Sequence, residues 1–238
     1  MATLSVIIIT KNEEVDLPAC LKSVSFADEI IIVDNGSTDQ TSEIAEQFNV
    51  KFFSEDWHGF GPQKNLSLSK ATCDWVFSID ADEVVPNKLA TEIKKIVENP
   101  VYDGYYIPRA TTFCGKKVRF GDWGRDKVLR LFKRGRGKFT NDQLHERVVV
   151  TGLTGKLKHS MVHNSVSSIE DAKEKMVNYA QISAKGRRGS LLKAISRSGW
   201  TFVRSYILLF GWLDGWTGFR VAQLCAKGTY LRYTYTKE

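Results

Sequence analysis

The sequence of 238 residues predicts an α/β fold, a mostly parallel sheet flanked by helices, with a helical appendage at the C-terminus. Three observations predict this fold. Between residues 4 and about 98, short apolar runs alternate with amphipathic stretches, as in β-α-β units. Between residues 101 and 160, Tyr, Arg, Gly and β-branched residues lack a helical period, which favours strands and loops. From residue 168 to 236, apolar residues again recur at helical spacing.

In the first part, each short apolar run predicts a buried strand. Four such strands are expected, over residues 4–9, 30–33, 51–53 and 75–79. Helices are expected over 16–25, after a cap at Thr38, and through 89–97, where Pro86 suits a position in or near the first turn. Gly36 is expected at positive φ in the turn before the Thr38 helix.

In the third part, Ile169, Ala172, Met176 and Tyr179 recur at intervals of three and four and predict a helix. Two further helices are expected, over 190–210 and 213–235. The predicted boundaries therefore define a domain over residues 1–165, with halves 1–104 and 105–165, and a helical region over residues 166–238.

The formal net charge of +7 conceals a strong segregation of charge. Residues 1–104 hold 8 basic and 18 acidic side chains, residues 105–160 hold 14 and 4, and the last 54 residues hold 10 and 2. An acidic first half argues against nucleic acid as the partner, although the average charge alone suggests it. The basic C-terminal region instead predicts an acidic surface nearby.

The cysteine pattern and the apolar runs indicate the cellular compartment of the protein. Four cysteines occur with no CxxC pair and no His at zinc spacing, so reduced packing cysteines of a cytosolic protein are expected. The apolar run over residues 4–9 has no basic segment before it and is too short for a signal peptide. A simple membrane-spanning helix is not expected, since no window reaches 18 apolar residues.

Acidic and polar residues follow three of the predicted strands. The first ends in Thr10-Lys11-Asn12-Glu13-Glu14, the second runs into Asp34-Asn35-Gly36-Ser37-Thr38-Asp39, and the fourth ends in Asp80-Ala81-Asp82-Glu83. Ligands of a parallel sheet collect at these carboxyl ends. The carboxylates would repel one another unless a bound cation offset their charge.

Asp80 and Asp82 are the sharpest pair, because carboxylates two residues apart in an extended chain point to the same side. Oxygen ligands of this kind suit Mg²⁺ or Mn²⁺, which take further ligands from substrate phosphates. Asp-x-Asp also occurs by chance at strand ends in solvent, but the two other polar strand ends that precede it favour the metal site.

Together, these three segments resemble the signatures of glycosyltransferase family 2, whose members are inverting nucleotide-sugar transferases with a GT-A fold. Residues 128–134 (VLRLFKR) and 144–148 (LHERV) further resemble a subgroup that includes lipopolysaccharide inner-core β-glucosyltransferases. The resemblance makes residues 1–165 a GT-A catalytic domain, with a nucleotide-sugar-binding half and an acceptor half.

The resemblance also implies roles for single residues. The uridine site would be lined by Thr10, Asn12, Glu13, Asp34 and Asp39. Asp80 and Asp82 would bind the donor diphosphate through the divalent cation. Lys64 stands where the family often has a basic residue near the nucleotide; the alternative is a solvated helix charge.

Inverting transfer needs a base that takes the proton from the acceptor hydroxyl. Between residues 105 and 160 the acidic residues are few: Asp122, Asp126, Asp142 and Glu146. Glu146 is the predicted base and Asp142 the second choice, because other family members use an Asp in this region. The alternative for Glu146 is a simple ion pair with an Arg such as Arg147.

Other side chains near this chemistry have two interpretations each. His145 and His163 are either additional metal ligands or structural histidines. Trp123 is expected to stack on a sugar, and Arg125 or Arg130 to bind an acceptor phosphate, although all three could equally pack and pair.

The C-terminal region mixes aromatic and basic residues between 200 and 235, a composition typical of an interfacial helix on anionic lipid. The sequence therefore predicts a peripheral membrane enzyme on the inner face of the cytoplasmic membrane. It would move a hexose, with glucose expected, from a UDP-sugar to a glycolipid such as lipopolysaccharide core.

Two alternatives remain open: transfer to polyprenyl phosphate or a peptide side chain, and a non-catalytic basic module that binds membrane or nucleic acid. A dinucleotide-binding site is not favoured, because Gly59-Phe60-Gly61 lacks the third glycine of the G-x-G-x-x-G motif. A P-loop is not favoured either, because no G-x-x-x-x-G-K-[ST] occurs.

Overall fold

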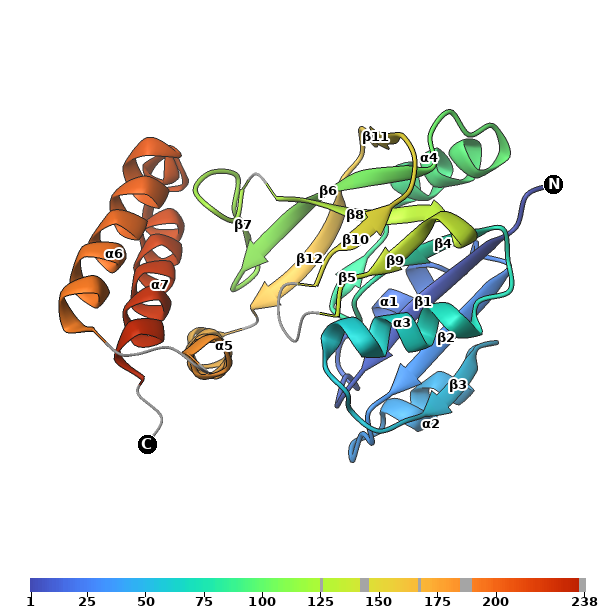
Figure 1. Ribbon diagram of the computed structural model, residues 1–238, viewed down its shortest axis with the longest axis horizontal. Helices are drawn as coiled ribbons and strands as arrows, with labels where there is room; N and C mark the ends of the chain where they lie inside the picture. The colour runs from blue at the N-terminus through green and yellow to red at the C-terminus, as the bar shows by residue number, and fades with distance from the viewer. Residues whose placement is uncertain (125, 142–145, 167, 185–189, 236–238) are drawn as a thin grey trace. The chain divides into compact units, whose positions relative to one another are not determined.

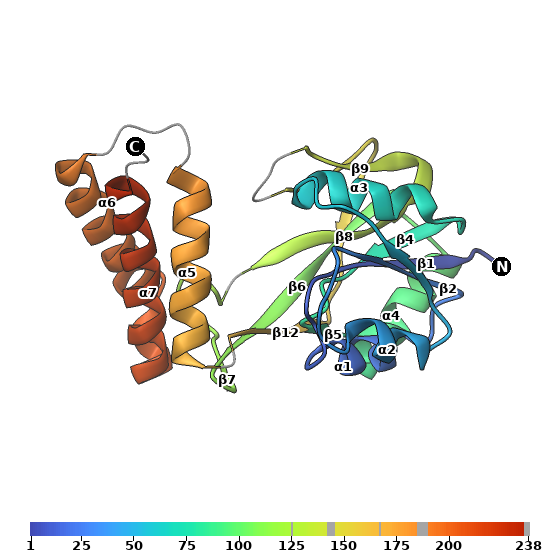
Figure 2. The same cartoon turned by 90° about the horizontal axis from the view of Figure 1, so that it is seen from below.

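The computed structural model describes residues 1–124, 126–141, 146–166, 168–184 and 190–235. The described chain divides into two compact units (Figures 1 and 2). Unit 1 comprises Met1–Arg109 and Lys127–His163, and unit 2 comprises Ala110–Asp126 and Asn164–Glu238. The helices and strands follow the predicted order, with α/β units first and helices last.

Ten of the described strands form one sheet, with the order β3-β2-β1-β4-β8-β6-β12-β5 and with β7 and β11 paired to β6. Their bounds are β1 Leu4–Thr10, β2 Glu29–Asp34, β3 Lys51–Ser54, β4 Trp75–Ser78, β5 Glu83–Val84, β6 Gly104–Phe113, β7 Lys116–Lys117, β8 Lys127–Lys133, β11 Thr154–Lys156 and β12 Met161–Val166. The strands β3, β2, β1 and β4 are parallel, whereas β8 runs antiparallel to β4. Strands β9 (Gly137–Phe139) and β10 (Val148–Val150) form a separate antiparallel pair.

Helices cover both faces of the parallel strands, as the continuous apolar runs require. The helices of unit 1 are α1 Leu17–Ser23, α2 Thr41–Glu46, α3 Phe60–Lys70 and α4 Asn87–Glu98. One core joins α1, α2 and α4 to alternate residues of β1 such as Val6 and Ile8, whereas Ile7 belongs to a second core beneath α3. Figure 2 shows the two layers, with α3 on one side of the sheet and the other three helices opposite.

The predicted strands and helices of the first part are confirmed, with one correction at α2. Thr38 was the expected cap, but α2 begins at Thr41 with Gln40 at the cap position. The backbone N–H of Thr38 instead donates to Asn12 Oδ1 at 2.8 Å, and Asp39 Oδ1 accepts from the N–H of Thr41 at 3.1 Å. Gly36 has the expected positive φ of 62°.

The described part of unit 2 contains three helices, α5 Ile169–Ala184, α6 Leu191–Val203 and α7 Gly215–Thr234. A π-helical turn η2 (Arg204–Leu208) and a 3-10 turn η3 (Gly211–Asp214) connect α6 to α7. The unit has its own small core, which includes Phe113, Val118 and Val221. Within the described residues, no helix is both long enough and apolar enough to span a bilayer. The four cysteines are unpaired, as predicted.

Glu29 at the start of β2 links three neighbouring segments of unit 1. Its carboxylate accepts hydrogen bonds from the Ser5 hydroxyl, from Lys51 Nζ at 2.6 Å, and from both the N–H and the hydroxyl of Thr72 at 2.9 Å. Burial raises the pKa of Glu29, but the hydrogen bonds from Lys51, Ser5 and Thr72 outweigh burial and lower this pKa to about 2.

This low pKa predicts an acid-sensitive contribution to stability. An unfolded Glu titrates near its ordinary value of 4.5, so the stabilisation is present above that pH and is lost as the pH falls from 4.5 to about 2. Between pH 6 and 2.5 the free energy of unfolding should fall by about 2–3 kcal/mol more in the wild type than in Glu29→Gln. Urea titrations at the two pH values measure the difference, and Glu46→Gln, at an exposed position of α2, should behave like the wild type.

Candidate active site

The carboxyl ends of β1, β2 and β4 meet at one edge of the sheet, because these strands are parallel and paired in register. Thr10 ends β1 opposite Asp34, which ends β2. The Thr10 hydroxyl donates to Asp34 Oδ1 at 2.8 Å, and both side chains are buried. The Asp34 carboxylate also accepts from the N–H of Ser37 at 2.7 Å. This arrangement fixes the Asp34 loop against the end of β1.

Hydrogen bonds join the loop after β1 to the loop after β2 at several points. The N–H of Asn12 donates to Ser37 Oγ at 2.8 Å, the N–H of Glu13 to Thr41 Oγ1 at 2.8 Å, and the N–H of Glu14 to Asp39 Oδ2 at 3.1 Å. The residues predicted for the uridine site, Thr10, Asn12, Glu13, Asp34 and Asp39, therefore lie together.

Beside these loops, the ends of β2 and β3 line a polar hollow of about 260 Å³. Its lining residues are Asn35, Gly36, Ser54, Glu55 and Asp56. The hollow lies at the carboxyl ends of parallel strands, where the ligands of such sheets bind.

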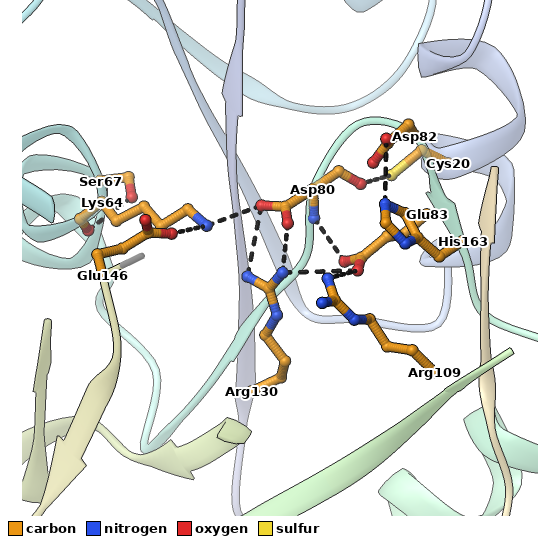
Figure 3. Close-up of polar contacts among 10 residues, drawn as sticks. All are labelled: Cys20, Lys64, Ser67, Asp80, Asp82, Glu83, Arg109, Arg130, Glu146 and His163. Carbon is orange, nitrogen blue, oxygen red and sulfur yellow. Dashed lines mark hydrogen bonds and ion pairs between the residues drawn. The ribbon is translucent and has the colours of Figure 1, made fainter. Parts of the chain in front are cut away.

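Asp80 follows β4 and lies among cationic side chains (Figure 3). Lys64 Nζ lies 2.8 Å from Asp80 Oδ1, and the Arg130 guanidinium contacts both carboxylate oxygens of Asp80. Burial raises the pKa of Asp80, but the charges of Arg130 and Lys64 outweigh burial and hold its pKa well below the ordinary value. Side-chain cations thus offset the charge of Asp80.

Glu83 is the fully buried centre of the same cluster. Glu83 Oε2 accepts from the N–H of Asp80 at 2.9 Å, and Glu83 Oε1 lies 3.5 Å from Arg130 Nη2 and 3.4 Å from Arg109 Nη1. Burial raises the pKa of Glu83 and the neighbouring Asp80 adds to the rise, although Arg130 opposes it. Glu83 therefore fixes the Asp80-Ala81-Asp82 turn through a backbone hydrogen bond and two arginines.

Lys64 joins Asp80 to the predicted base. Its Nζ lies 2.7 Å from Glu146 Oε1, while its side chain is 5% exposed. The alternative that Lys64 is a solvated helix charge is therefore wrong. Glu146 pairs with Lys64 of α3, and its own side chain is 14% exposed. A buried ammonium thus holds two carboxylates from distant parts of the sequence beside each other, as Figure 3 shows.

Asp82 lies on the other side of the turn from this cluster, beside His163 of β12. Asp82 Oδ2 and His163 Nε2 are 3.3 Å apart, and both side chains are partly exposed. Ligands at right angles and about 2.1 Å from one cation lie about 3 Å apart, so these two atoms fit neighbouring positions around Mg²⁺ or Mn²⁺. The described residues contain no group of three or more metal-ligand side chains, so further ligands would come from substrate and water.

Several predicted residues lie elsewhere. Trp123 belongs to the core of unit 2, with its ring centroid 6.1 Å from that of Phe113. Arg130, the predicted acceptor-phosphate ligand, is buried, and both of its terminal nitrogens contact carboxylates. Arg125, Asp142 and His145 lie outside the described residues.

Sequence reasoning missed the positions of Arg130 and Glu83 in the Asp80 cluster. One signal was present: Arg130 interrupts an apolar strand between Leu129 and Leu131, both of which are buried. A charged residue at an inward position of a buried strand needs a buried partner of opposite charge.

Comparison with known proteins identifies relatives over the whole chain. A family model described as glycosyl transferase family 2 matches residues 5–155. An uncharacterised glycosyltransferase of Rickettsia typhi is 30% identical over 256 residues, with 100% of this chain and 88% of the relative covered. The lipopolysaccharide core biosynthesis glycosyltransferase LpsC of Rhizobium meliloti is 28% identical over 250 residues, with coverage of 97% and 93%.

A solved structure shares the fold. S. aureus TarS 1–349 in complex with UDP aligns with a TM-score of 0.51 and 18% identity, over 88% of this chain and 74% of TarS 1–349. The family-model match spans the loops after β1, β2 and β4, together with Lys64, Arg130 and Glu146. His163 lies beyond its end.

Proposed function

The chain belongs to glycosyl transferase family 2 and has a GT-A fold, and we propose that it moves a hexose, expected to be glucose, with inversion from UDP to lipopolysaccharide core. The observation that carries the proposal is the position of Lys64 Nζ, 2.8 Å from Asp80 and 2.7 Å from Glu146. One side chain thereby joins the carboxylate expected at the donor diphosphate to the carboxylate expected at the acceptor hydroxyl.

Two comparisons support the choice of substrates. TarS was solved with UDP, and the hollow beside Asn35 and Asp56 is polar and adjoins the residues predicted to hold uridine. LpsC is named for lipopolysaccharide core biosynthesis and aligns over nearly its full length. A sugar hydroxyl of a core saccharide is therefore the proposed nucleophile.

In the proposed reaction, the Glu146 carboxylate accepts the proton of the acceptor hydroxyl while the hydroxyl oxygen attacks the anomeric carbon. The bond from that carbon to the diphosphate oxygen breaks, and UDP leaves with the electron pair. Lys64 positions Glu146, and Asp80 in turn positions Lys64. Glu83 and Arg130 maintain the turn that presents Asp82.

Asp82 and His163 are the residues that would hold a divalent cation. When bound, such a cation would offset the charge that develops on the departing diphosphate. The oxygen and nitrogen donors of this pair suit Mn²⁺ or Mg²⁺ completed by phosphate oxygens. The Asp80 carboxylate already contacts Lys64 and Arg130. Asp80 would therefore lie next to the divalent cation, near the donor diphosphate.

Asp82→Ala tests this assignment. We expect the Kd for UDP in the presence of Mn²⁺ to rise at least about tenfold, because a carboxylate ligand to the cation is lost. Binding of UDP without metal should be unchanged. Isothermal titration calorimetry with and without Mn²⁺ measures both.

Asp103→Ala is the control, because Asp103 is a surface carboxylate paired with Lys133 at 2.9 Å. Unchanged Mn²⁺-dependent binding in Asp82→Ala would contradict the metal site. If the wild type neither binds UDP nor hydrolyses any UDP-sugar with Mn²⁺ or Mg²⁺, the proposed function itself fails.

A further inference from the structure

Exposed apolar side chains of unit 2 are concentrated in one segment. Of the nineteen large apolar side chains exposed among the described residues, eleven lie between Leu191 and Trp216. Single exposed apolar residues are ordinary on a protein surface, but a cluster of this size is typical of a binding surface. The segment comprises α6, the turns η2 and η3, and the first residues of α7.

Helix α6 presents three stripes of different chemistry. The inner stripe packs on α7: Ala194 is buried, and the hydroxyl of Thr201 lies 3.3 Å from that of Thr229. The second stripe is apolar and exposed, with Leu192, Ile195 and Val203. The third stripe is polar and exposed, with Lys193, Arg197 and Trp200 at spacings of four and three; Arg204 of η2 continues it. An apolar stripe beside a stripe of cations and Trp is typical of a helix that lies in a membrane interface.

The connection between α6 and α7 carries the other exposed apolar side chains. They are Ile207, Leu208, Phe210, Trp212, Leu213 and Trp216. Phe210 has φ of 58°, a left-handed conformation that costs a non-glycine residue roughly 1–2 kcal/mol. A bulky apolar residue is therefore held in an unfavourable backbone conformation while it stays 46% exposed.

Internal contacts fix this connection in place. The Asp214 carboxylate accepts from the N–H groups of Arg119 and Phe120 at 2.8 Å, and the N–H of Gly121 donates to the carbonyl of Leu209 at 2.9 Å. Gly218 lets α7 approach closely, since a Cβ there would lie 1.9 Å from the carbonyl oxygen of Gly211. The exposed apolar side chains thus project from an ordered turn.

An aromatic cluster supports the same turn from inside the unit. The rings of Phe202, Tyr206 and Phe219 contact one another at centroid distances of 5.5–5.8 Å. Trp216 stacks on Phe219 at 5.3 Å, and the Arg220 guanidinium lies 5.3 Å from the Trp216 ring. Phe202, Tyr206 and Phe219 therefore pack against one another, whereas Trp216 stacks on Phe219 and stays exposed.

The charge of the segment selects its partner. Between Leu191 and Trp216 the charged residues are Lys193, Arg197, Arg204 and Asp214. Arg204 pairs with Asp122, and the Asp214 carboxylate accepts from backbone N–H groups, so Lys193 and Arg197 are the cations that would meet an anionic partner. A surface of this sign attracts an anionic partner. Two copies of the chain would bring like charges together, so the surface disfavours its own copy.

We infer that the segment Leu191–Trp216 docks on an anionic lipid bilayer, with the apolar side chains of the α6–α7 connection inserted and the cations of α6 at the headgroups. Trp side chains are favoured at the level of the headgroups, where one edge of the ring is apolar and the other is hydrated. Cations near an anionic membrane surface add to the binding. The inference stands apart from sugar transfer, since it uses no residue of the candidate active site.

Vesicle co-sedimentation of the full chain tests the inference. With phosphatidylglycerol vesicles, Leu208→Ser/Leu213→Ser should bind at least tenfold more weakly than the wild type, because two inserted apolar side chains are lost. Lys193→Glu/Arg197→Glu should also bind at least tenfold more weakly, and the wild type should prefer these vesicles to phosphatidylcholine vesicles. In the wild type, brominated lipids should quench Trp fluorescence.

Val149→Ser/Leu153→Ser is the matched control, because those two apolar side chains of unit 1 are 60% and 72% exposed. This control should bind vesicles like the wild type, and all variants should keep wild-type circular dichroism and UDP binding. Equal vesicle binding by wild type and Leu208→Ser/Leu213→Ser would overturn the inference. The inference would also be overturned if the wild type did not bind protein-free vesicles but formed dimers, and if sedimentation velocity showed that the same substitutions dissociate these dimers.

Discussion

Glu146→Gln is expected to lower the rate of sugar transfer by about 10²–10⁴-fold while UDP binding stays unchanged. The amide cannot accept the proton of the acceptor hydroxyl, yet its oxygen can still accept the hydrogen bond from Lys64 that now reaches Glu146 Oε1 at 2.7 Å. The substitution therefore removes the base without removing the contact that positions it. Transfer of labelled glucose from UDP-glucose to a truncated lipopolysaccharide core measures the rate.

Arg147→Gln is the control for this experiment, because Arg147 is the exposed neighbour of Glu146. It should keep nearly full transfer. Wild-type transfer by Glu146→Gln would move the base to another residue, with Asp142 next to be replaced. Loss of UDP binding in Glu146→Gln would instead assign Glu146 to the donor site.

Arg130→Met should lower the free energy of unfolding by about 3–5 kcal/mol, because it leaves the fully buried carboxylate of Glu83, and the partly exposed one of Asp80, without their main counter-charge. The Arg130 guanidinium contacts Asp80 and also lies 3.5 Å from Glu83, which is fully buried. These two carboxylates raise the pKa of Arg130 against the effect of burial, so the cation belongs to the folded state. Urea denaturation at pH 7 measures the loss.

Lys133→Met on the same strand supplies the comparison. Lys133 pairs with Asp103 at 2.9 Å, but its side chain is 41% exposed, so this substitution should cost at most about 1 kcal/mol. A loss below 1 kcal/mol in Arg130→Met would show that the Asp80 cluster does not depend on this cation. The double variant Arg130→Met/Glu83→Gln should recover part of the stability, because the amide removes one uncompensated charge.

The parallel half of the fold follows from local sequence patterns. The runs that became β1, β2 and β4 are continuous and apolar because the strands are buried on both faces, and the helices of α1 and α4 show one apolar stripe each. Because parallel strands share one carboxyl edge, the pattern also brought Thr10 and Asp34 together.

Partners from the second half could not be assigned in the same way. Nothing local in the sequence tells that Arg130 faces Asp80 or that His163 lies beside Asp82, because both contacts depend on how β8 and β12 pair in the sheet. Trp123 had two interpretations, sugar stacking and packing, and the contact of its ring with that of Phe113 favours packing.

The long sequence separation of the ion pairs around Asp80 has a consequence for synthesis of the chain. Lys64 and Glu146 are 82 residues apart, and Arg130 is 50 residues from Asp80. At about 5–20 residues per second, roughly 3–13 s separate the emergence of Asp80 from that of Glu146 on a ribosome. Lys64 emerges before Asp80, whereas Arg130 and Glu146 emerge after it, so the complete cluster around Asp80 can form only after β8 and the segment before β10 have joined the fold.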